Sequence, residues 1–587
     1  MSTPAARPAA RLLNRWSPGR RVAVASALTA ALAASAVAPT FAGTDETSAA
    51  TTSGRDRDDD RYDDRHDERL DLDSLTIPDA QERMEEGSLT SAELTEAYLT
   101  RILLLDPKLN SIIDIDHQAL GAARASDEHR EHEGPRSELE GIPVLLKDNI
   151  DAEGFATTAG SRALTGTLPD DAVLTERLRA AGAIILGKTN LTEWANFRGN
   201  GSTSGWSGLG GQTNNPYVLD RNPCGSSSGS GVAAAAALAQ VTIGTETNGS
   251  IVCPAGQNGV VGLKPTLGLV SRTGIIPISA EQDTAGPMAR HVVDVAITTA
   301  VIQGTDVDDA ATREIPDGQP QDYLELLDDE SLEGARVGVW RPYELGRLDG
   351  NEPPENWTEE DEAGLEAVEE VVADTRAALE EAGAAVVEVE LPTQAEIDGV
   401  TFGLLKAEFA RDLPAYLGST PGTHPRTLQG LIDFNTADAE AELWPFGQEI
   451  FTDTAALPPQ PTPETVALRE HTRRLARESI DETLAKHGLD AIVAPTNSAA
   501  WRTTYLNGEG GEDDRFVFGS SSPAAVAGYP NITVPAGFVG ELPIGVSFFG
   551  TRWDEADLLS YAYDFEDETE ARERPRFIPS IDDDEDD

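Results

Sequence analysis

The sequence is poor in cysteine and in positive charge, and each shortage excludes a class of protein. Two cysteines in 587 residues cannot build a disulfide scaffold or a multi-cysteine zinc or iron–sulfur framework. The 45 basic residues face 102 acidic ones, which gives a formal net charge of −57. Nucleic-acid binding needs a basic surface, so this charge argues against nucleic-acid partners and equally against anionic membrane surfaces.

Lysine is scarcer still, because only six of the basic residues are lysines. A lysine-poor, acid-rich chain is typical of proteins from high salt, where carboxylates keep the surface hydrated and salt screens their repulsion. Compositional drift is the alternative explanation. Either way, a lysine in an apolar segment stands out as a candidate functional residue.

The first 42 residues resemble a targeting segment. Arginines, among them the adjacent pair Arg20 and Arg21, precede the mildly apolar run 22–38, which is short for a membrane span. We expect a signal peptide, possible twin-arginine type, cleaved near Ala42, and therefore a secreted or extracytoplasmic protein without stable membrane association after signal removal. An uncleaved membrane anchor is the alternative.

The rest of the chain divides by composition. Residues 43–74 are an acidic stretch with few large apolar side chains and should be a disordered linker; residues 581–587 form an acidic tail. Between them, residues 75–580 alternate helical and strand patterns. Leu365, Val368, Val372 and Leu379 follow a helical spacing, Gly383 ends that helix, and 384–389 reads as a strand. Such alternation predicts an α/β domain around a large, mostly parallel sheet.

Two motif matches are weak. Gly182-x4-Gly187-Lys188-Thr189 fits the phosphate-loop pattern, but its middle residues are the apolar strand itself rather than a loop of small residues. Gly225-x-Ser227-x-Gly229 fits the nucleophile elbow of α/β-hydrolases. That enzyme class needs a late histidine, and none of His291, His424, His471 and His487 has a convincing setting.

Three separated pieces make a stronger set. Lys147 ends the apolar strand-like run from Gly141, where loss of hydration would lower its pKa and make it a base. A Gly/Ser loop follows at 224–231. The segment 244–254 then places Ser250 after a tight glycine turn, where successive backbone N–H groups can point at one spot, as an oxyanion hole requires.

Together these pieces resemble the amidase signature family of serine hydrolases. The similarity spans most of residues 75–575, including 262–266, 282–287, 494–496, 527–530 and 542–545, and its motifs look closest to the bacterial peptide amidases. The resemblance implies one large α/β domain with a mixed, mostly parallel central sheet flanked by helices. It also implies an enzyme that needs no metal or other cofactor.

Carried over by position, the resemblance makes Lys147 the catalytic lysine, Ser226 the bridging serine on a cis peptide bond after Gly225, and Ser250 the nucleophile. The oxyanion hole falls on the backbone of Thr247, Asn248, Gly249 and Ser250. Ser227 is expected to support the loop by hydrogen bonding.

Two further expectations concern nearby residues. We interpret Cys224 and Cys253 as buried free thiols rather than a disulfide or a nucleophile, although export would permit a disulfide. Asp283 and Arg290 are expected to form a structural ion pair.

The expected function is hydrolysis of a small-molecule or peptide amide, and the peptide C-terminal amide is the preferred substrate. Two alternatives stay open. One is an amidotransferase-like subunit that needs partners and tRNA, against which the signal segment and the charge argue. The other is a non-catalytic scaffold with the same fold, against which the intact Lys147, Ser226 and Ser250 set argues.

Overall fold

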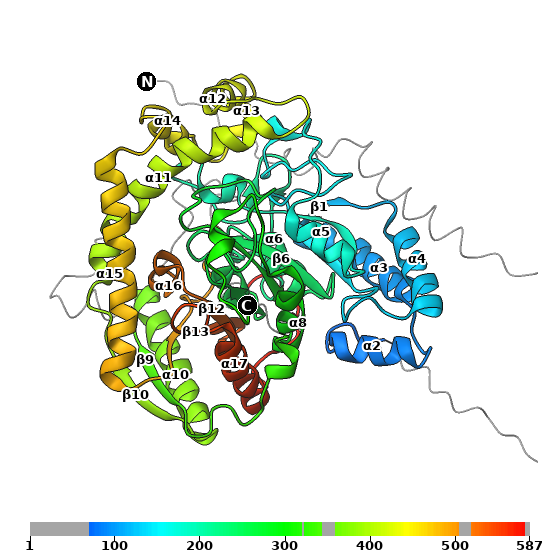
Figure 1. Cartoon of the computed structure of the whole chain (residues 1–587), viewed down its shortest axis with the longest axis vertical. Coiled ribbons are helices and arrows are strands. Elements are labelled where there is room, and N and C mark those ends of the chain that lie inside the picture. Colours follow the sequence, from blue (N-terminus) through cyan, green and yellow to red (C-terminus); the bar gives the residue numbers. More distant parts are fainter. Residues whose placement is uncertain (1–69, 320–321, 343–358, 504–517, 582–587) are drawn as a thin grey trace, which may run out of the picture. The chain divides into compact units, whose positions relative to one another are not determined.

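The computed structural model describes residues 70–319, 322–342, 359–503 and 518–581 (Figure 1). Residues 73–587 form one compact unit, separate from residues 1–72. The expected signal segment 1–42, most of the linker 43–74 and most of the tail 581–587 lie outside the described residues, so these boundaries stay predictions. Across the described ranges, no helix is long and apolar enough to cross a membrane.

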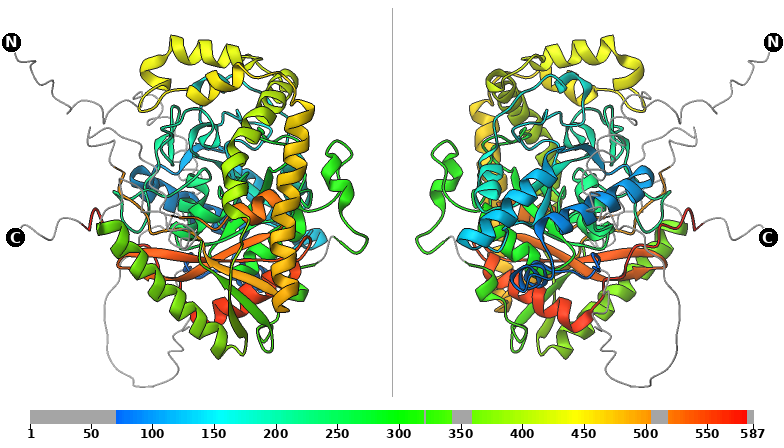
Figure 2. Two further views of the ribbon diagram at one scale, coloured as in Figure 1. Left: turned by 90° about the vertical axis from the view of Figure 1, so that its left-hand side faces the viewer. Right: turned by 90° about the vertical axis from the view of Figure 1, so that its right-hand side faces the viewer.

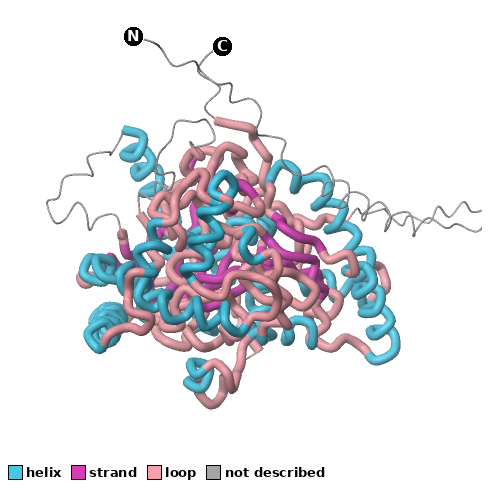
Figure 3. The backbone as a smooth tube through the Cα atoms, turned by 90° about the horizontal axis from the view of Figure 1, so that it is seen from above, coloured by secondary structure: helices cyan, strands magenta, loops and turns pink. Residues whose placement is uncertain are grey.

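One mixed sheet of eleven strands, counted over the described residues, runs through the interior of the compact unit, with helices outside it (Figure 3). In spatial order the strands are β1 (Ile112–Ile115), β3 (Ile184–Thr189), β2 (Pro143–Lys147), β6 (Val241–Glu246), β8 (Thr284–Ala289), β7 (Val261–Lys264), β12 (Asn531–Val539), β13 (Leu542–Phe549), β11 (Ala491–Pro495), β9 (Arg336–Trp340) and β10 (Ala385–Val389). Parallel pairing joins β3 to β2 to β6 and β11 to β9 to β10. The predicted α/β fold, with a large mixed sheet in one domain, is confirmed.

The helices fall into groups along the chain. They are α2 (Ile77–Glu85), α3 (Ser91–Leu109), α4 (Ala119–Glu133), α5 (Val173–Ala180), α6 (Ser228–Ala235), α7 (Val252–Gln257), α8 (Val292–Ile302), α10 (Glu359–Glu381), α11 (Gln394–Ser419), α12 (Leu428–Ala437), α13 (Ala439–Glu442), α14 (Glu449–Ala455), α15 (Pro463–His487), α16 (Ser522–Ala527) and α17 (Glu555–Thr569). A short two-stranded ribbon, β4 (Trp206–Ser207) with β5 (Gly211–Gln212), stands apart from the sheet.

The apolar spacing read from the sequence corresponds to buried faces. Leu365, Val368, Val372 and Leu379 of α10 are all buried, and Gly383 takes a φ of +95° before β10 begins. A left-handed φ favours glycine, so the residue that ends the helix is also the one that turns the chain into the sheet. The predicted strands at 183–186, 337–340, 491–494 and 532–535 likewise fall in β3, β9, β11 and β12.

Helices α11 to α15 form a separate layer at one end of the sheet, yellow in Figure 2. Their inner face packs on the short segment around η2 (Glu193–Asn196). The Phe197 and Phe409 rings lie 5.0 Å apart, and the Trp194 and Phe451 rings 5.4 Å apart, both edge to face. These aromatic contacts fix the segment from 193 to 198 beneath α11 and α14, next to the candidate site.

A pair of buried carboxyl groups joins the same segment to α13. Glu193 accepts from Arg198 Nη1 at 2.6 Å, and Glu442 accepts from the Arg162 N–H at 2.9 Å. Burial first, and then the neighbouring Glu193, raise the pKa of Glu442 to about 8. The other charged groups that face this pair are Arg162 and Asp438, 2.9 Å apart. Glu442 is therefore a proton-carrying carboxyl group at neutral pH.

We expect Glu442→Gln to stabilise the protein at pH 8 and to have less effect at pH 5. The folded state keeps a proton on Glu442 that the unfolded chain loses above its usual pKa. The free energy of unfolding of the wild type therefore falls as pH rises towards about 8, whereas glutamine does not titrate. Thermal unfolding should show a gain of about 2 °C or more at pH 8. Glu470→Gln, on the exposed side of α15, is the matched control, and a lower melting temperature of Glu442→Gln at both pH values would contradict the shared proton.

Candidate active site

Two adjacent strands end at the same edge of the sheet and bring candidate catalytic groups together there. β2 ends at Lys147, and β6 ends at Glu246. The strands run parallel with Leu146 beside Ile243, so their carboxyl ends coincide. Helix α6 packs on both strands, and the loop that precedes it therefore lies at the same edge.

Lys147 is fully buried at this edge. Its Nζ lies 2.8 Å from Ser226 Oγ, 2.9 Å from Thr245 Oγ1 and 3.2 Å from the Thr245 carbonyl oxygen. Burial lowers the pKa of Lys147 to about 7, and the charges of Glu246 and Asp283 offset only part of that shift. A neutral amine has two N–H donors and one lone pair, so Thr245 can accept both N–H groups while the lone pair faces the Ser226 hydroxyl.

Ser226 lies on a loop with special geometry. Its peptide bond with Gly225 is cis, as the resemblance implies. A Cβ atom on Gly225 would collide with Thr192 Oγ1, which explains the glycine there. Ser227 Oγ donates to the Thr245 carbonyl at 3.1 Å and accepts from the Thr245 N–H at 3.2 Å. Ser227 thus makes the supporting hydrogen bonds expected of it and attaches the loop to β6.

Cys224 and Cys253 form a disulfide, with their Cα atoms 6.0 Å apart, so the prediction of free thiols is wrong. The two cysteines are 29 residues apart in the sequence, and the packing of α6 against α7 brings them together. The bridge joins the loop that carries Ser226 to the helix that follows Ser250. It therefore ties together the two segments whose relative position a serine relay would depend on.

Glu246 shapes the turn that presents Ser250, a part that the sequence analysis did not assign. Its carboxylate accepts from the N–H groups of Gly249 at 2.8 Å, Ile251 at 2.8 Å and Val252 at 3.1 Å. Gly249 has a φ of +83°, which favours glycine at this position. A glutamate at the end of β6, three residues before a glycine, is the sequence signal that could have suggested this role.

The predicted oxyanion-hole residues lie together on this turn, with one difference from the expected set. The Gly249 N–H is already bound to Glu246, so the candidates that remain are the N–H groups of Thr247, Asn248 and Ser250. The Ser250 side chain is partly exposed, and its hydroxyl has no hydrogen-bond partner among the described residues. Its carbonyl accepts from the Ser227 N–H at 3.1 Å, which places the two serine loops side by side.

Side chains from distant helices hold the same turn. The Asn248 side chain donates to Ser522 Oγ at 3.0 Å and accepts from Ser521 Oγ at 2.8 Å. Gln282 donates to the Thr247 carbonyl at 2.8 Å and accepts from Arg469 of α15 at 2.8 Å. The turn is therefore held from α16 and α15 as well as from β6.

Asp283 and Arg290 do not form the expected ion pair. Asp283 accepts from Thr247 Oγ1 at 2.6 Å, and burial raises its pKa to about 6. Arg290 donates instead to the carbonyl oxygen of Ala239 at 2.9 Å and to the Tyr98 hydroxyl at 3.2 Å. The two residues stand at different ends of β8, which starts at Thr284 and ends at Ala289, and this separation explains the error.

The rival motifs have structural roles. Lys188 is in β3, where its Nζ forms an ion pair with Asp148 at 3.1 Å and donates to the Ile150 carbonyl at 2.5 Å, so it is a buried strand residue and not part of a phosphate loop. In the described structure, none of the four candidate histidines lines the cavity beside Ser226. That leaves the elbow interpretation of Ser227 without a base.

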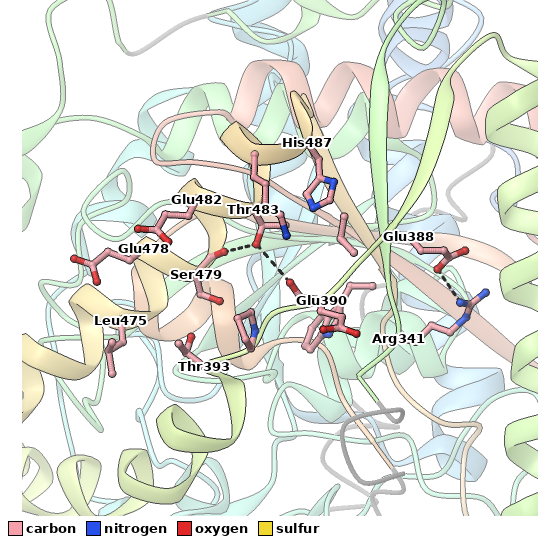
Figure 4. Close-up of a pocket in the computed structure, with 14 residues that line it drawn as sticks. Arg341, Glu388, Glu390, Thr393, Leu475, Glu478, Ser479, Glu482, Thr483 and His487 are labelled. Atoms are coloured by element: carbon pink, nitrogen blue, oxygen red, sulfur yellow. Dashed lines mark hydrogen bonds and ion pairs between the residues drawn. The ribbon is translucent and has the colours of Figure 1, made fainter. Parts of the chain in front are cut away.

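A small cavity opens beside Ser226. The residues that line it come from β2, β6 and the segments around 195 and 275; they are Asn149, Ala195, Ser226, Thr245, Glu246, Thr247, Arg272, Ile275, Ile276, Ile278, Asp283 and Thr284. A larger pocket lies away from these groups, between α15 and the end of β10 (Figure 4). Its labelled residues include the ion pair of Arg341 with Glu388, 2.7 Å apart, and neither Lys147 nor Ser250 lines it.

Comparison with known proteins decides the family, because the amidase family model matches residues 93–559. This chain belongs to the amidase family. It is 36% identical over 518 residues to a probable amidase of Arabidopsis thaliana (86% of this chain, 91% of that one). It is also 35% identical over 507 residues to a glutamyl-tRNA(Gln) amidotransferase subunit of Acinetobacter baumannii (85% and 97%).

A solved structure, the peptide amidase of Stenotrophomonas maltophilia, shares 47% of its residues with this amidase over 86% of this chain and 99% of that one, with a TM-score of 0.79. These similarities identify the chain as an amide-hydrolysing enzyme. Among the residues that the structure describes, no group of histidine, cysteine, aspartate and glutamate side chains is arranged to hold a metal ion.

Removal of the disulfide should lower both stability and activity. Cross-linking residues 29 apart stabilises a folded protein by about 3–4 kcal/mol in the chain-entropy account. We expect a double serine variant of Cys224 and Cys253 to melt several degrees lower and to hydrolyse amides more slowly than the wild type. Dithiothreitol should reproduce the loss in the wild type and leave the double variant unchanged, and a reduced wild type with unaltered melting and rate would contradict this role.

Proposed function

We propose that this amidase hydrolyses the C-terminal carboxamide of peptides through an acyl-enzyme on Ser250. The observation that carries the proposal is the contact of the buried Lys147 Nζ with Ser226 Oγ at 2.8 Å, beside a serine whose hydroxyl is available. A desolvated lysine with a pKa near 7 is a competent base at neutral pH. The adjacent serine then serves as the proton relay to the nucleophile.

In the proposed acylation step, neutral Lys147 takes the Ser226 proton while Ser226 takes the Ser250 proton. Ser250 Oγ forms a bond to the amide carbonyl carbon, whose oxygen becomes the oxyanion. The N–H groups of Thr247, Asn248 and Ser250 are the proposed donors to that oxygen. Loss of one such donor typically costs about 10²–10³ in rate.

Collapse of this intermediate breaks the carbon–nitrogen bond. Ser226 gives its proton to the departing nitrogen and recovers one from Lys147, so ammonia leaves and the acyl group stays on Ser250. Water then attacks the acyl group through the same relay, and the carboxylic acid is released. Each group ends in the protonation state in which it started.

The substrate and the setting are also proposals. The similarity to a peptide amidase favours a peptide over a simple carboxamide. The arginine-rich segment 1–42 supports export, and the net charge of −57 supports function in high salt. The disulfide near the site fits an oxidising compartment.

A second candidate is an amidotransferase-type subunit, favoured by 35% identity to such a subunit over 97% of its length. The two functions differ in what the isolated chain can do. A protein of that kind would pass ammonia to a partner, whereas a standalone amidase releases it from the substrate into solution.

Ammonia release from the purified mature chain should separate these functions. We expect C-terminally amidated peptides to be better substrates than simple carboxamides, across a series from low to molar salt. Ser250→Ala should lower kcat by about 10³-fold or more, because the nucleophile is lost. Ser88→Ala, at an exposed position outside the site, is the control. Release from simple carboxamides alone would remove the peptide assignment, and no release from folded protein would favour the amidotransferase-type function.

The pH dependence of kcat/KM should reveal Lys147. Because only the neutral amine can accept a proton, kcat/KM should fall tenfold per pH unit below about 7. Lys147→Met should lower kcat/KM by about 10²–10⁴-fold and abolish that acid limb. Lys264→Met is the matched control, because burial also lowers the pKa of Lys264, to about 8, but its Nζ donates to the Pro265 carbonyl. An acid limb that persists in Lys147→Met would assign the titration to another group.

A further inference from the structure

Asn149 is the polar residue beside Lys147 that the proposed reaction leaves without a role. It is buried, with only 3% of its surface exposed, and it lines the cavity that Ser226 and Thr247 also line. Its Nδ2 donates to Thr245 Oγ1 at 2.9 Å. Its Oδ1 has no hydrogen-bond partner in the described structure. Asn149 thus presents a buried acceptor to the cavity where the reacting bond would lie.

A buried acceptor without a partner is costly, and the other polar side chains of the cavity do not satisfy it. Arg272 is bound to Asp309, with Nε 2.7 Å from Oδ2. The Thr247 hydroxyl donates to Asp283. Since the donors nearby are committed, the partner of Asn149 Oδ1 is best supplied by a ligand that carries an N–H group.

Thr245 fixes the direction of this acceptor. Its Oγ1 receives both Asn149 Nδ2 and Lys147 Nζ, at 2.9 Å each. The amide group of Asn149 is therefore held by the same hydroxyl that positions the base, and Ser226 lies on the other side of that base. An N–H group bound by Asn149 would consequently lie close to the hydroxyl that delivers the proton.

We propose that Asn149 Oδ1 accepts an N–H of the scissile carboxamide nitrogen and thereby selects amides over esters. The inference rests on the proposed function of the Lys147, Ser226 and Ser250 groups. When Ser250 has added to the carbonyl, the nitrogen keeps its two protons and gains a basic lone pair. Asn149 holds one N–H, which turns the lone pair towards Ser226. Ser226 then donates its proton to that nitrogen as the carbon–nitrogen bond breaks, and Asn149 exchanges no proton.

The test compares two substrates with one acyl group, N-acetyl-phenylalaninamide and N-acetyl-phenylalanine methyl ester. Both form the same acyl-enzyme, so the ratio of their kcat/KM values reports on the leaving group alone. An ester has no N–H to donate. We expect Asn149→Leu to lower kcat/KM for the amide by about 10–100-fold and that for the ester by about 3-fold or less. Equal losses on both substrates would overturn the proposal, because a merely structural role would affect them alike.

A second variant tests whether the group acts as an acceptor. Asn149→Asp keeps an oxygen towards the cavity, and its added charge acts on the Lys147 base that both substrates share, so it cancels in the ratio. We expect Asn149→Asp to retain most of the amide preference that Asn149→Leu loses. Loss of the preference in both variants would mean that Asn149 donates rather than accepts, and it would overturn the proposal.

The controls separate this inference from the proposed function. Asn214→Leu makes the same replacement at an asparagine whose Nδ2 donates to the Lys108 carbonyl at 2.8 Å, outside the cavity, and should leave the ratio unchanged. If the wild type hydrolyses neither substrate, the proposed function fails. If the wild type hydrolyses both and the ratio is unaltered in Asn149→Leu, only the role of Asn149 fails.

Discussion

The burial of one lysine side chain is the constraint on which the rest of the site depends. A protonated amine in a cavity without water is costly, so Lys147 is driven towards its neutral form, and Thr245 and Ser226 are the groups left to receive it. Lys147 needs the end of a strand that is buried on both faces, which only an interior parallel strand provides. The position of β2 between β3 and β6 is thus the structural source of the base.

Carboxylates inside this acidic protein serve as organisers of backbone. Glu246 binds three N–H groups of the turn that carries Ser250, and Asp283 binds the N–H groups of Ile278 and Ser279 on the cavity wall, both at 2.8 Å. Glu408 of α11 binds Arg469 through both oxygens, at 2.7 and 2.6 Å. Through Gln282 that ion pair reaches the Thr247 carbonyl, so the outer helices and the turn form one connected network.

The sequence predicted what lies in short, contiguous patterns. The strand that ends at Lys147, the Gly/Ser loop with Ser226 and the glycine turn before Ser250 are each local, and the amphipathic spacing of α10 was likewise sufficient to place that helix. It failed where a partner comes from elsewhere in the fold. The Cys224–Cys253 bridge and the Thr247–Asp283 contact depend on which loops meet at one sheet edge, and spacing along the chain does not contain that information.

The same limit explains why Asn149 was not singled out. An asparagine two residues after a buried strand is unremarkable in sequence, and its significance comes from Thr245, which binds one end of its amide and leaves the other end unpaired. Thr245 also binds Lys147, so the base and the acceptor share one anchor. A site that fixes a proton acceptor and an N–H acceptor on the same hydroxyl is better matched to an amide than to an ester, because only the amide can use both groups at once.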